Sequence, residues 1–296
     1  MSRFVLIGHP VGHSLSPAIH RAAYRALGLS HEYDLVDAVD EAAVRGIVDE
    51  LRRGRIAGAN VTVPYKRLAL ELADRAHPLA ASTGAANVLA REGSQVVAYN
   101  TDVLALADQL GERAAGARVA AVIGNGGAAL AALAACRSLG VERVGVVARA
   151  WRAAERPARW PRAAEFQKAG AIVLPWPSEP VPGRAGVAGD AWDTLVCSSQ
   201  IIVQATSAGM LGVGDGGSVR DIVPWPRLGA GTLAFDVVYN PPVTPFLEAA
   251  NAAAVRSEGG LGMLVGQAAR TLSLWLGVEP PRGSMREAAE QALEAA

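Results

Sequence analysis

The chain has 296 residues, of which 51% are hydrophobic and 5% aromatic, and its 28 basic and 28 acidic side chains leave a formal charge of zero. This length suits about two domains of roughly 150 residues each. A neutral chain lacks the basic excess typical of proteins that bind nucleic acid or anionic membranes. Cys136 and Cys197 have no CxxC spacing, so we expect neither a disulfide framework nor a metal site. No apolar run suits a signal peptide or reaches the ~20 residues of a membrane span, so we expect a soluble cytoplasmic protein.

Strands and helices alternate over the first hundred residues. Apolar runs predict strands at 4–7, 31–36 and 56–63, helices at 16–27, 41–53 and 67–76, and a hairpin of strands 87–91 and 95–99. Ser16 followed by Pro17 is typical of a helix start, with serine as the N-cap and proline at the first helical position. The alternation favours an α/β fold with a mostly parallel sheet.

The segment from Gly58 to Lys66 reads GANVTVPYK and ends in a lysine. On a strand, Asn60 and Thr62 face one side and the valines face the other. Pro64 cannot donate to a sheet, so the strand should end there. Lys66 then falls just beyond the strand end, where α/β sheets place their ligands. The alternative is an exposed lysine that opens the next helix, beside a solvated sheet edge.

Three polar clusters interrupt this regular pattern. Ser14 and Ser16 form the first, although Ser16 is also explained as a helix cap. Asn87 ends a turn of small residues, where an asparagine is also ordinary turn chemistry. Asp102 follows the hairpin at the start of a helix, where an acid is common. It could also orient the ammonium of Lys66 while that lysine transfers a proton. The distance along the chain leaves open whether the two residues touch.

The middle of the chain carries a glycine turn between a strand at 119–123 and a helix at 130–139. Gly124, Gly126 and Ala129 match G-x-G-x-x-G/A, in which the helix N-terminus binds a pyrophosphate. The next strand, 144–148, ends at Arg149 rather than at the acid that binds an NAD ribose. Arg149 and Arg152 suit a 2′-phosphate, which favours NADPH over NADH. The alternative is two solvated surface arginines.

The remaining elements are predicted more sparsely. We expect helices at 161–169, 244–251 and 263–276, strands at 171–174, 201–204 and 232–238, a Pro/Gly-rich surface loop at 175–189, and an exposed helix at 284–296. The loop 205–212 either lies along a nicotinamide or is an ordinary connector. Gln267 lies on the long helix at 263–276; it is either buried with hydrogen-bond partners or faces solvent.

Taken in order, six segments of the chain resemble the shikimate/quinate dehydrogenase family. They are His13–Pro17 (HSLSP), Gly58–Lys66, Gly84–Asn87 (GAAN), Asn100–Asp102 (NTD), Gly124–Ala128 (GNGGA) and Gly262–Gln267 (GMLVGQ). The resemblance implies a substrate domain at 1–102, a Rossmann-like NADP-binding domain at 103–258, and C-terminal helices at 259–296 that return to the substrate domain. It also implies a monomer or homodimer.

The same resemblance assigns roles to residues. Lys66 and Asp102 would be the catalytic pair, and Ser14 and Ser16 would bind the substrate carboxylate. The ring hydroxyls would be held by Asn60, Thr62, Asn87 and Gln267, with Tyr239 and Met263 flanking the site. The cofactor would be bound by Gly124, Asn125, Gly126, Gly127, Ala128, Arg149, Arg152, Thr206, Met210, Val238, Gly260 and Met263.

The implied reaction is the reversible reduction of 3-dehydroshikimate to shikimate with NADPH, a step of chorismate and aromatic amino-acid biosynthesis. The alternatives are a paralogue that uses quinate or aminoshikimate with NAD(P), and a non-catalytic protein that senses a shikimate-like ligand or a nucleotide. Three positions depart from the family pattern: Ala148-Arg149-Ala150 replaces Asn-Arg-Thr, Gln204 replaces an asparagine, and Val103 replaces a glycine. These changes leave fewer adenosine contacts and affect the domain junction.

Overall fold

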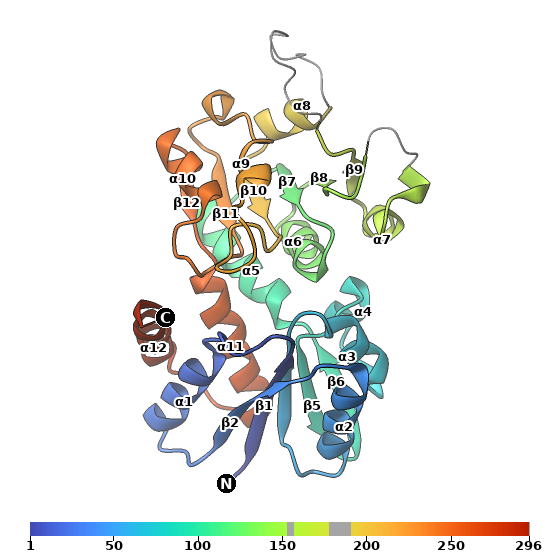
Figure 1. The fold of residues 1–296 in the computed structure, drawn as a ribbon, viewed down its shortest axis with the longest axis vertical. Coiled ribbons are helices and arrows are strands. Elements are labelled where there is room, and N and C mark those ends of the chain that lie inside the picture. Colours follow the sequence, from blue (N-terminus) through green and yellow to red (C-terminus); the bar gives the residue numbers. More distant parts are fainter. Residues whose placement is uncertain (153–156, 178–190, 296) are drawn as a thin grey trace. The chain divides into compact units, whose positions relative to one another are not determined.

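The computed structural model describes residues 1–152, 157–177 and 191–295. The chain forms two compact units (Figure 1). The first comprises residues 1–105 and 262–296, so both ends of the chain build it, and the second comprises residues 106–261. The assignment of substrate binding to 1–102 and of NADP binding to 103–258 stays a prediction at this point.

The first unit contains a six-stranded sheet in the order β2-β1-β3-β5-β6-β4. Its strands are β1 (Arg3–Gly8), β2 (Glu32–Asp37), β3 (Gly58–Val61), β4 (Arg75–Ala76), β5 (Val88–Glu92) and β6 (Gln95–Tyr99). β1 pairs parallel with both β2 and β3, whereas the predicted hairpin of β5 and β6 joins β3 in antiparallel pairing. The sheet is therefore mixed: it is parallel over β2, β1 and β3, antiparallel over β3, β5 and β6, and parallel again where β4 joins β6.

Helices cover both faces of this sheet (Figure 1). They are α1 (Ser16–Ala26), α2 (Glu41–Arg52), α3 (Lys66–Leu72), α4 (Pro78–Thr83), the start of α5 (Thr101–Arg113), α11 (Leu261–Leu276) and α12 (Arg282–Glu294). The alternation of β1 decides which residue faces which layer. Val5 and Ile7 pack into the core cluster with the apolar residues of α2. Phe4, next to Val5 on the other face, stacks on Trp275 of α11 with ring centroids 4.7 Å apart.

Trp275 also explains a glycine in the lysine segment. A Cβ atom at Gly58 would overlap the indole of Trp275, so β3 approaches α11 more closely than any other residue would permit. The indole nitrogen donates a hydrogen bond to the carbonyl oxygen of Leu89 on β5, 3.2 Å away. Helix α11 is thereby fixed to the middle of the sheet in the first unit.

The predicted bounds of several elements in the first unit differ from the observed ones. The helix expected over 67–76 ends at Leu72, and Arg75–Ala76 forms β4 beside β6. The strand expected to reach Val63 ends at Val61, and Val63 is 68% exposed rather than facing the core. The tail is a helix but not a detached one, because Met285 and Ala289 of α12 are fully buried and α12 packs on α1. Its apolar stripe is short and easily overlooked among charged residues.

The second unit contains a six-stranded sheet, β12-β11-β10-β7-β8-β9, with parallel pairing throughout its described strands. The strands are β7 (Val119–Ile123), β8 (Arg143–Val147), β9 (Ile172–Leu174), β10 (Ile201–Gln204), β11 (Leu233–Asp236) and β12 (Arg256–Glu258). The helices are the rest of α5, α6 (Gly127–Ser138), α7 (Ala163–Lys168), α8 (Ala191–Cys197), α9 (Gly217–Arg220) and α10 (Pro245–Ala252), with 3-10 turns η1 (Pro157–Arg159) and η2 (Trp225–Arg227). Together with the first unit, this is the α/β class that the alternation predicts.

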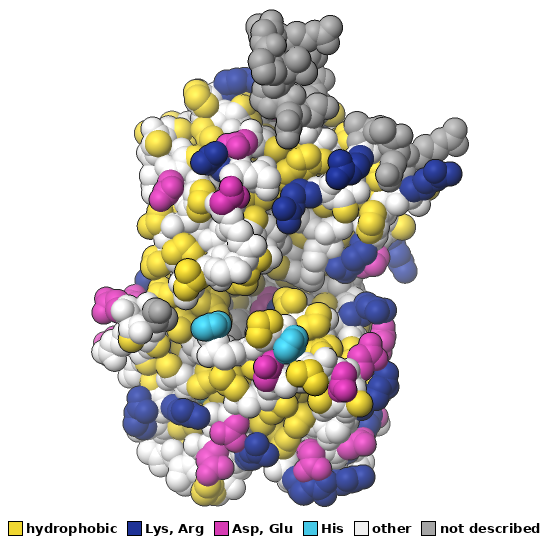
Figure 2. All heavy atoms as spheres, viewed as in Figure 1, with side chains coloured by type: hydrophobic (Ala, Val, Ile, Leu, Met, Phe, Trp, Pro, Cys, Tyr) yellow, Lys and Arg dark blue, Asp and Glu magenta, His cyan; other side chains and the backbone are white. Residues whose placement is uncertain are grey.

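Two predictions for the second unit need correction and one stays open. The helix expected at 130–139 begins earlier, at Gly127, and β12 was not expected because its sequence, Arg-Ser-Glu, has no apolar signal. Residues 178–189 of the predicted Pro/Gly-rich loop lie outside the described residues. No helix in the described ranges is long and apolar enough to cross a lipid bilayer. On the visible face of the first unit, acidic and basic side chains are interspersed, in keeping with the zero formal charge (Figure 2).

Candidate active site

Lys66 and Asp102 form an ion pair in the first unit. Nζ of Lys66 lies 2.6 Å from Oδ2 of Asp102, and the two side chains are 22% and 11% exposed. Lys66 is the first residue of α3, just beyond the end of β3, and Asp102 lies in the first turn of α5, just beyond β6. The sequence predicted both residues but left open whether they touch. The fold joins them because their strands belong to one sheet.

Asn87 fixes the carboxylate of Asp102 from its other side. Its Nδ2 donates to Oδ1 of Asp102 at 2.8 Å and to Oγ1 of Thr101 at 2.9 Å. Its Oδ1 accepts the backbone N–H of Thr101 at 2.8 Å. The amide is thus held at both ends, and one oxygen of Asp102 faces an amide while the other faces the ammonium. A buried polar group satisfied in this way has a single orientation.

The other amides predicted for the site join the same network. Gln267, on α11, is only 9% exposed, which decides between the two alternatives for it. Its Oε1 accepts from Nδ2 of Asn87 at 3.4 Å, and its Nε2 donates to the carbonyl of Leu264 at 3.0 Å. Nδ2 of Asn60 lies 3.3 Å from the carbonyl oxygen of Asn87 and 3.4 Å from Oγ1 of Thr271. Donors and acceptors from β3, α5, α11 and the turn before β5 therefore meet at one place.

The two serines lie at the start of α1, but not as predicted. The N-cap residue is Leu15, and Ser16 is the first residue of the helix, so its predicted cap role is wrong. Oγ of Ser14 instead accepts the backbone N–H of Ser16 at 3.2 Å, and the two hydroxyl oxygens are also 3.2 Å apart. Because Ser14 occupies the backbone donor, the hydroxyl of Ser16 is left to turn toward other partners.

The remaining predicted substrate residues have simpler surroundings. Thr62 is half-buried, and its methyl group fills the space that a Cβ at Gly8 would need. Met263 is buried at the start of α11. Tyr239 belongs to the second unit, where burial raises the pKa of its phenol. Its predicted place beside the substrate stays a prediction.

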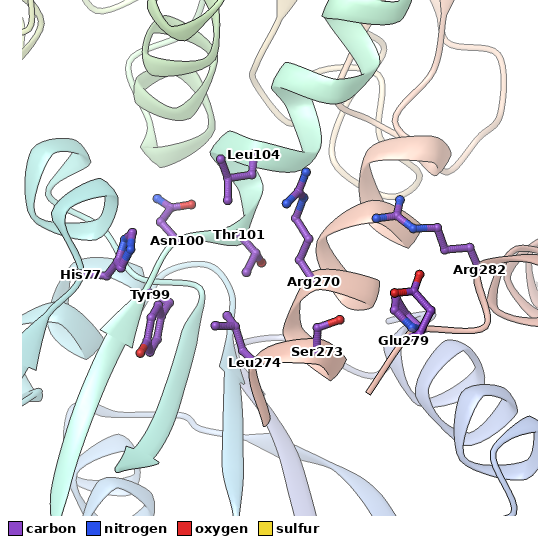
Figure 3. A pocket seen from close by; sticks show the side chains of 11 residues that line it. His77, Tyr99, Asn100, Thr101, Leu104, Arg270, Ser273, Leu274, Glu279 and Arg282 are labelled. Atoms are coloured by element: carbon purple, nitrogen blue, oxygen red, sulfur yellow. The ribbon is translucent and has the colours of Figure 1, made fainter. Parts of the chain in front are cut away.

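A pocket of about 380 Å³ lies near this network, beside α11 (Figure 3). His77 and Tyr99 stack on one side of it, and Arg270, Glu279 and Arg282 lie on the other. Thr101 reaches both places, since it lines the pocket and bonds Asn87. Lys66 and Asp102 are not among the lining residues, so this hollow is separate from the ion pair.

The predicted dinucleotide turn has the geometry that its glycines imply. Gly124 has a φ of +132°, and a Cβ there would lie 2.8 Å from the carbonyl oxygen of Ala205. Any other residue would therefore adopt an unfavourable backbone conformation and also clash with this carbonyl. Gly126 is the N-cap of α6 and makes no side-chain cap bond. Within the described residues, no atom lies within 4 Å of a Cβ built on Gly126. A helix start without a side-chain cap and with open space beside its N-cap glycine suits a pyrophosphate.

Other predicted cofactor residues surround this turn within the second unit. Asn125, Gly127 and Ala128 are half-buried at the start of α6, and Arg149 and Arg152 are exposed beyond the carboxyl end of β8. Thr206 is half-buried in the loop after β10, and Met210 is 37% exposed in the same loop. Val238 is buried, and its carbonyl oxygen accepts the N–H of Gly260 at 3.0 Å.

Gln204, one of the departures from the family pattern, organises the loop after β10. Its Nε2 donates to the carbonyl of Ala208 at 3.0 Å and to Oδ1 of Asp236 at 3.2 Å, and its Oε1 accepts the N–H of Thr206 at 2.5 Å. Asp236 also accepts from the hydroxyl of Thr244 at 2.6 Å. Burial raises the pKa of Asp236 to about 7, although these hydrogen bonds act in the opposite direction. The longer glutamine therefore keeps the loop bonded to β11.

Sequence reasoning missed three side chains of the network: Thr101, Thr271 and Tyr33. Thr271 follows Gln267 by four residues on α11, so the same helix face was an available signal. Thr101 lies within the segment Asn100–Asp102 that carries the family resemblance, but the sequence assigned it no contact. Tyr33 carried no signal, because an aromatic residue on a strand is ordinarily core.

Comparisons with known proteins place the chain beside one group of relatives. Residues 6–89 match the shikimate dehydrogenase substrate binding domain, and residues 260–290 match the shikimate 5'-dehydrogenase C-terminal domain. Relatives named shikimate dehydrogenase (NADP(+)) include those of Geobacter sulfurreducens, 36% identical with 95% of this chain and 93% of that one covered, and Citrifermentans bemidjiense, 37% identical with 96% and 92% covered. A shikimate 5-dehydrogenase of Thermus thermophilus, solved in complex with NADP(H) and shikimate, is 31% identical. It superposes with a TM-score of 0.80 over 99% of this chain and 100% of that one.

Proposed function

The chain belongs to the shikimate dehydrogenase family, and we propose accordingly that it catalyses the reversible, NADP-dependent reduction of 3-dehydroshikimate to shikimate. The observation that carries the proposal is the ion pair of Lys66 and Asp102, held in a buried amide network. A protein that only bound a ligand would not need an aligned proton donor there. The reaction is a step of chorismate and aromatic amino-acid biosynthesis.

The reduction adds a hydride to the ketone carbon and a proton to its oxygen. NADPH supplies the hydride when it is bound. Lys66 gives a proton from Nζ to the oxygen, and its positive charge stabilises the negative charge that develops there. In the oxidation of shikimate, the neutral amine takes the hydroxyl proton. Asp102, 2.6 Å away, compensates the ammonium and keeps it aligned throughout.

The network around the pair supports the substrate roles that the family assigns. Asn60, Asn87 and Gln267 offer amide donors and acceptors from three parts of the first unit, which suits several hydroxyls on one ring. Ser14 and Ser16 offer two hydroxyls at the start of α1 for a carboxylate. Thr62, Met263 and Tyr239 complete the proposed contacts, with the substrate held by residues 1–102 and the C-terminal helices.

The second unit supports a cofactor role. The turn Gly124–Ala128 would hold the pyrophosphate at the N-terminus of α6. Arg149 and Arg152 are exposed beyond β8 and would grip the 2′-phosphate of NADP. Thr206, Met210, Val238, Gly260 and Met263 would contact the nicotinamide half. The monomeric or homodimeric state, the cytoplasmic location, and the absence of nucleic-acid or membrane partners stay predictions.

The proposal is tested by following NADPH absorbance with purified protein. Shikimate with NADP should give steady turnover, and 3-dehydroshikimate with NADPH should give the reverse reaction. Quinate and NAD, offered separately, test the paralogue alternative. Saturable binding of shikimate without turnover in either direction would instead identify the sensor.

A further inference from the structure

Tyr33 lies inside the first unit with its hydroxyl against a predicted substrate contact. Its side chain is fully buried on β2. Oη lies 2.8 Å from Oδ1 of Asn60. Asn60 comes from β3, so the side chain of Tyr33 joins β2 to the hydroxyl end of the proposed site.

The neighbours of Asn60 decide the direction of this hydrogen bond. The other end of its amide lies 3.3 Å from the backbone carbonyl oxygen of Asn87, which can only accept. That end must therefore be the NH2 group, and the end facing Tyr33 must be the oxygen. Tyr33 then has to donate. Burial raises the pKa of its phenol well above the usual value, so the proton is retained.

The ring of Tyr33 is itself held in place. His20 of α1 stacks on it with centroids 4.3 Å apart and planes 8° apart. His20 is fully buried, and burial lowers its pKa to about 3, so the imidazole is neutral at physiological pH. A neutral, stacked ring restricts the tilt of the phenol without competing for its proton. The hydroxyl therefore has a fixed position.

We propose that Tyr33 is a positioning residue: it donates to Oδ1 of Asn60 and so holds from one end the amide that the proposed function places against the ring hydroxyls of the substrate. This inference rests on the proposed function, because it concerns how shikimate is held. It assigns no chemistry to Tyr33, which acts through Asn60. Without the phenol hydroxyl, Oδ1 of Asn60 loses its hydrogen-bond donor, and the amide is held only through its NH2 group.

The chain offers a matched control in Tyr24. This tyrosine is also buried, belongs to the same aromatic cluster, and lies 6.2 Å from His20 between ring centroids. Within the described parts of the chain, its hydroxyl has no hydrogen-bond partner. Tyr24→Phe and Tyr33→Phe therefore remove the same atom from the same cluster, but only the second removes a contact to the site.

In Tyr33→Phe the KM for shikimate should rise about tenfold while kcat changes less than about threefold, because a binding contact and not the proton transfer is disturbed. The KM for NADP should not change. Tyr24→Phe should match the wild type in all three constants. In the Asn60→Ala background, adding Tyr33→Phe should not raise the KM for shikimate any further, because the tyrosine acts through that amide. Thermal unfolding of each variant confirms that it is folded.

A second readout separates positioning from a general structural role. The readout uses shikimate analogues that lack the 4- or the 5-hydroxyl. For the analogue that lacks the hydroxyl contacted by Asn60, wild type and Tyr33→Phe should have equal KM values. Three results overturn the inference: an unchanged KM in folded Tyr33→Phe, an equal loss in Tyr24→Phe, or full additivity with Asn60→Ala. In each of these the wild type still oxidises shikimate, so the proposed function survives. A wild type that neither oxidises shikimate nor binds it overturns both.

Discussion

Nζ of Lys66 lies 2.6 Å from Oδ2 of Asp102, although the two residues are 36 positions apart in the chain. Each lies just after a strand of the same sheet, at the start of a helix. The pair can therefore act as one unit, in which a partly buried ammonium is aimed by a carboxylate that Asn87 already holds.

Replacing Lys66 with alanine should lower kcat about 100- to 10,000-fold, the usual contribution of a positioned acid or base. Shikimate affinity, measured by calorimetry, should change little because the amides and serines remain. Arg67→Ala is the matched control, since Arg67 is the next residue, is 76% exposed and pairs only with Glu71 on its own helix among the described contacts. Near-normal turnover in Lys66→Ala would falsify the catalytic assignment.

Arg149→Ala should weaken NADPH binding about tenfold or more, the effect of losing a charged hydrogen bond to phosphate, while NADH binding stays the same. The control is Arg143→Ala. Arg143 is an exposed arginine at the opposite end of β8, away from the turn. Fluorescence or calorimetric titrations of both cofactors measure the effect. Equal losses for NADPH and NADH would show that Arg149 contacts something other than the 2′-phosphate.

Asp236 should make the second unit less stable as the pH rises. Burial raises its pKa from 3.8 to about 7 in the folded chain, so between these values the native state holds a proton that the unfolded state has released. The free energy of unfolding then falls by about 1.4 kcal/mol per pH unit across that window. Above pH 7 this contribution is lost and the dependence ends.

Urea unfolding from pH 4 to 8 tests this dependence by comparing wild type with Asp236→Asn. The asparagine keeps an oxygen for Gln204 and the N–H of Val238, so the difference between the two curves should isolate the titration. Asp221→Asn, at an exposed position of the same unit, should leave the pH dependence unchanged. A wild-type curve parallel to that of Asp236→Asn rules out the raised pKa.

His20 should act with the opposite sign in the first unit. Its pKa falls from 6.5 to about 3 on burial, so below pH 6.5 the unfolded state takes up a proton that the native state does not. The free energy of unfolding should drop by about 1.4 kcal/mol for each pH unit from pH 6.5 down to about pH 3, where the native state takes up the proton as well. His20→Leu should abolish this pH dependence, although its altered packing can change the free energy of unfolding by the same amount at every pH. His13→Leu, at an exposed position, should leave the pH dependence unchanged.

Much of the fold was predictable because its signals are local. The strand β7, the glycine turn and the hairpin β5–β6 each fit within a dozen residues, and a short apolar run or a glycine with positive φ decides them. The helix ends were less predictable. The predicted α3 ran on into β4, because only pairing with β6, which the local sequence does not record, makes Arg75–Ala76 a strand.

The order of residues along the chain was enough to predict the fold class, the glycine turn and the candidate site residues Lys66, Asp102 and the three amides. It took the packed molecule to show that these groups touch, that Ser14 rather than Ser16 bonds the backbone at the start of α1, and that Tyr33 is bonded to the site. Asn60 and Thr271 are 211 positions apart, and a hydrogen bond between such residues depends on packing that no local pattern contains.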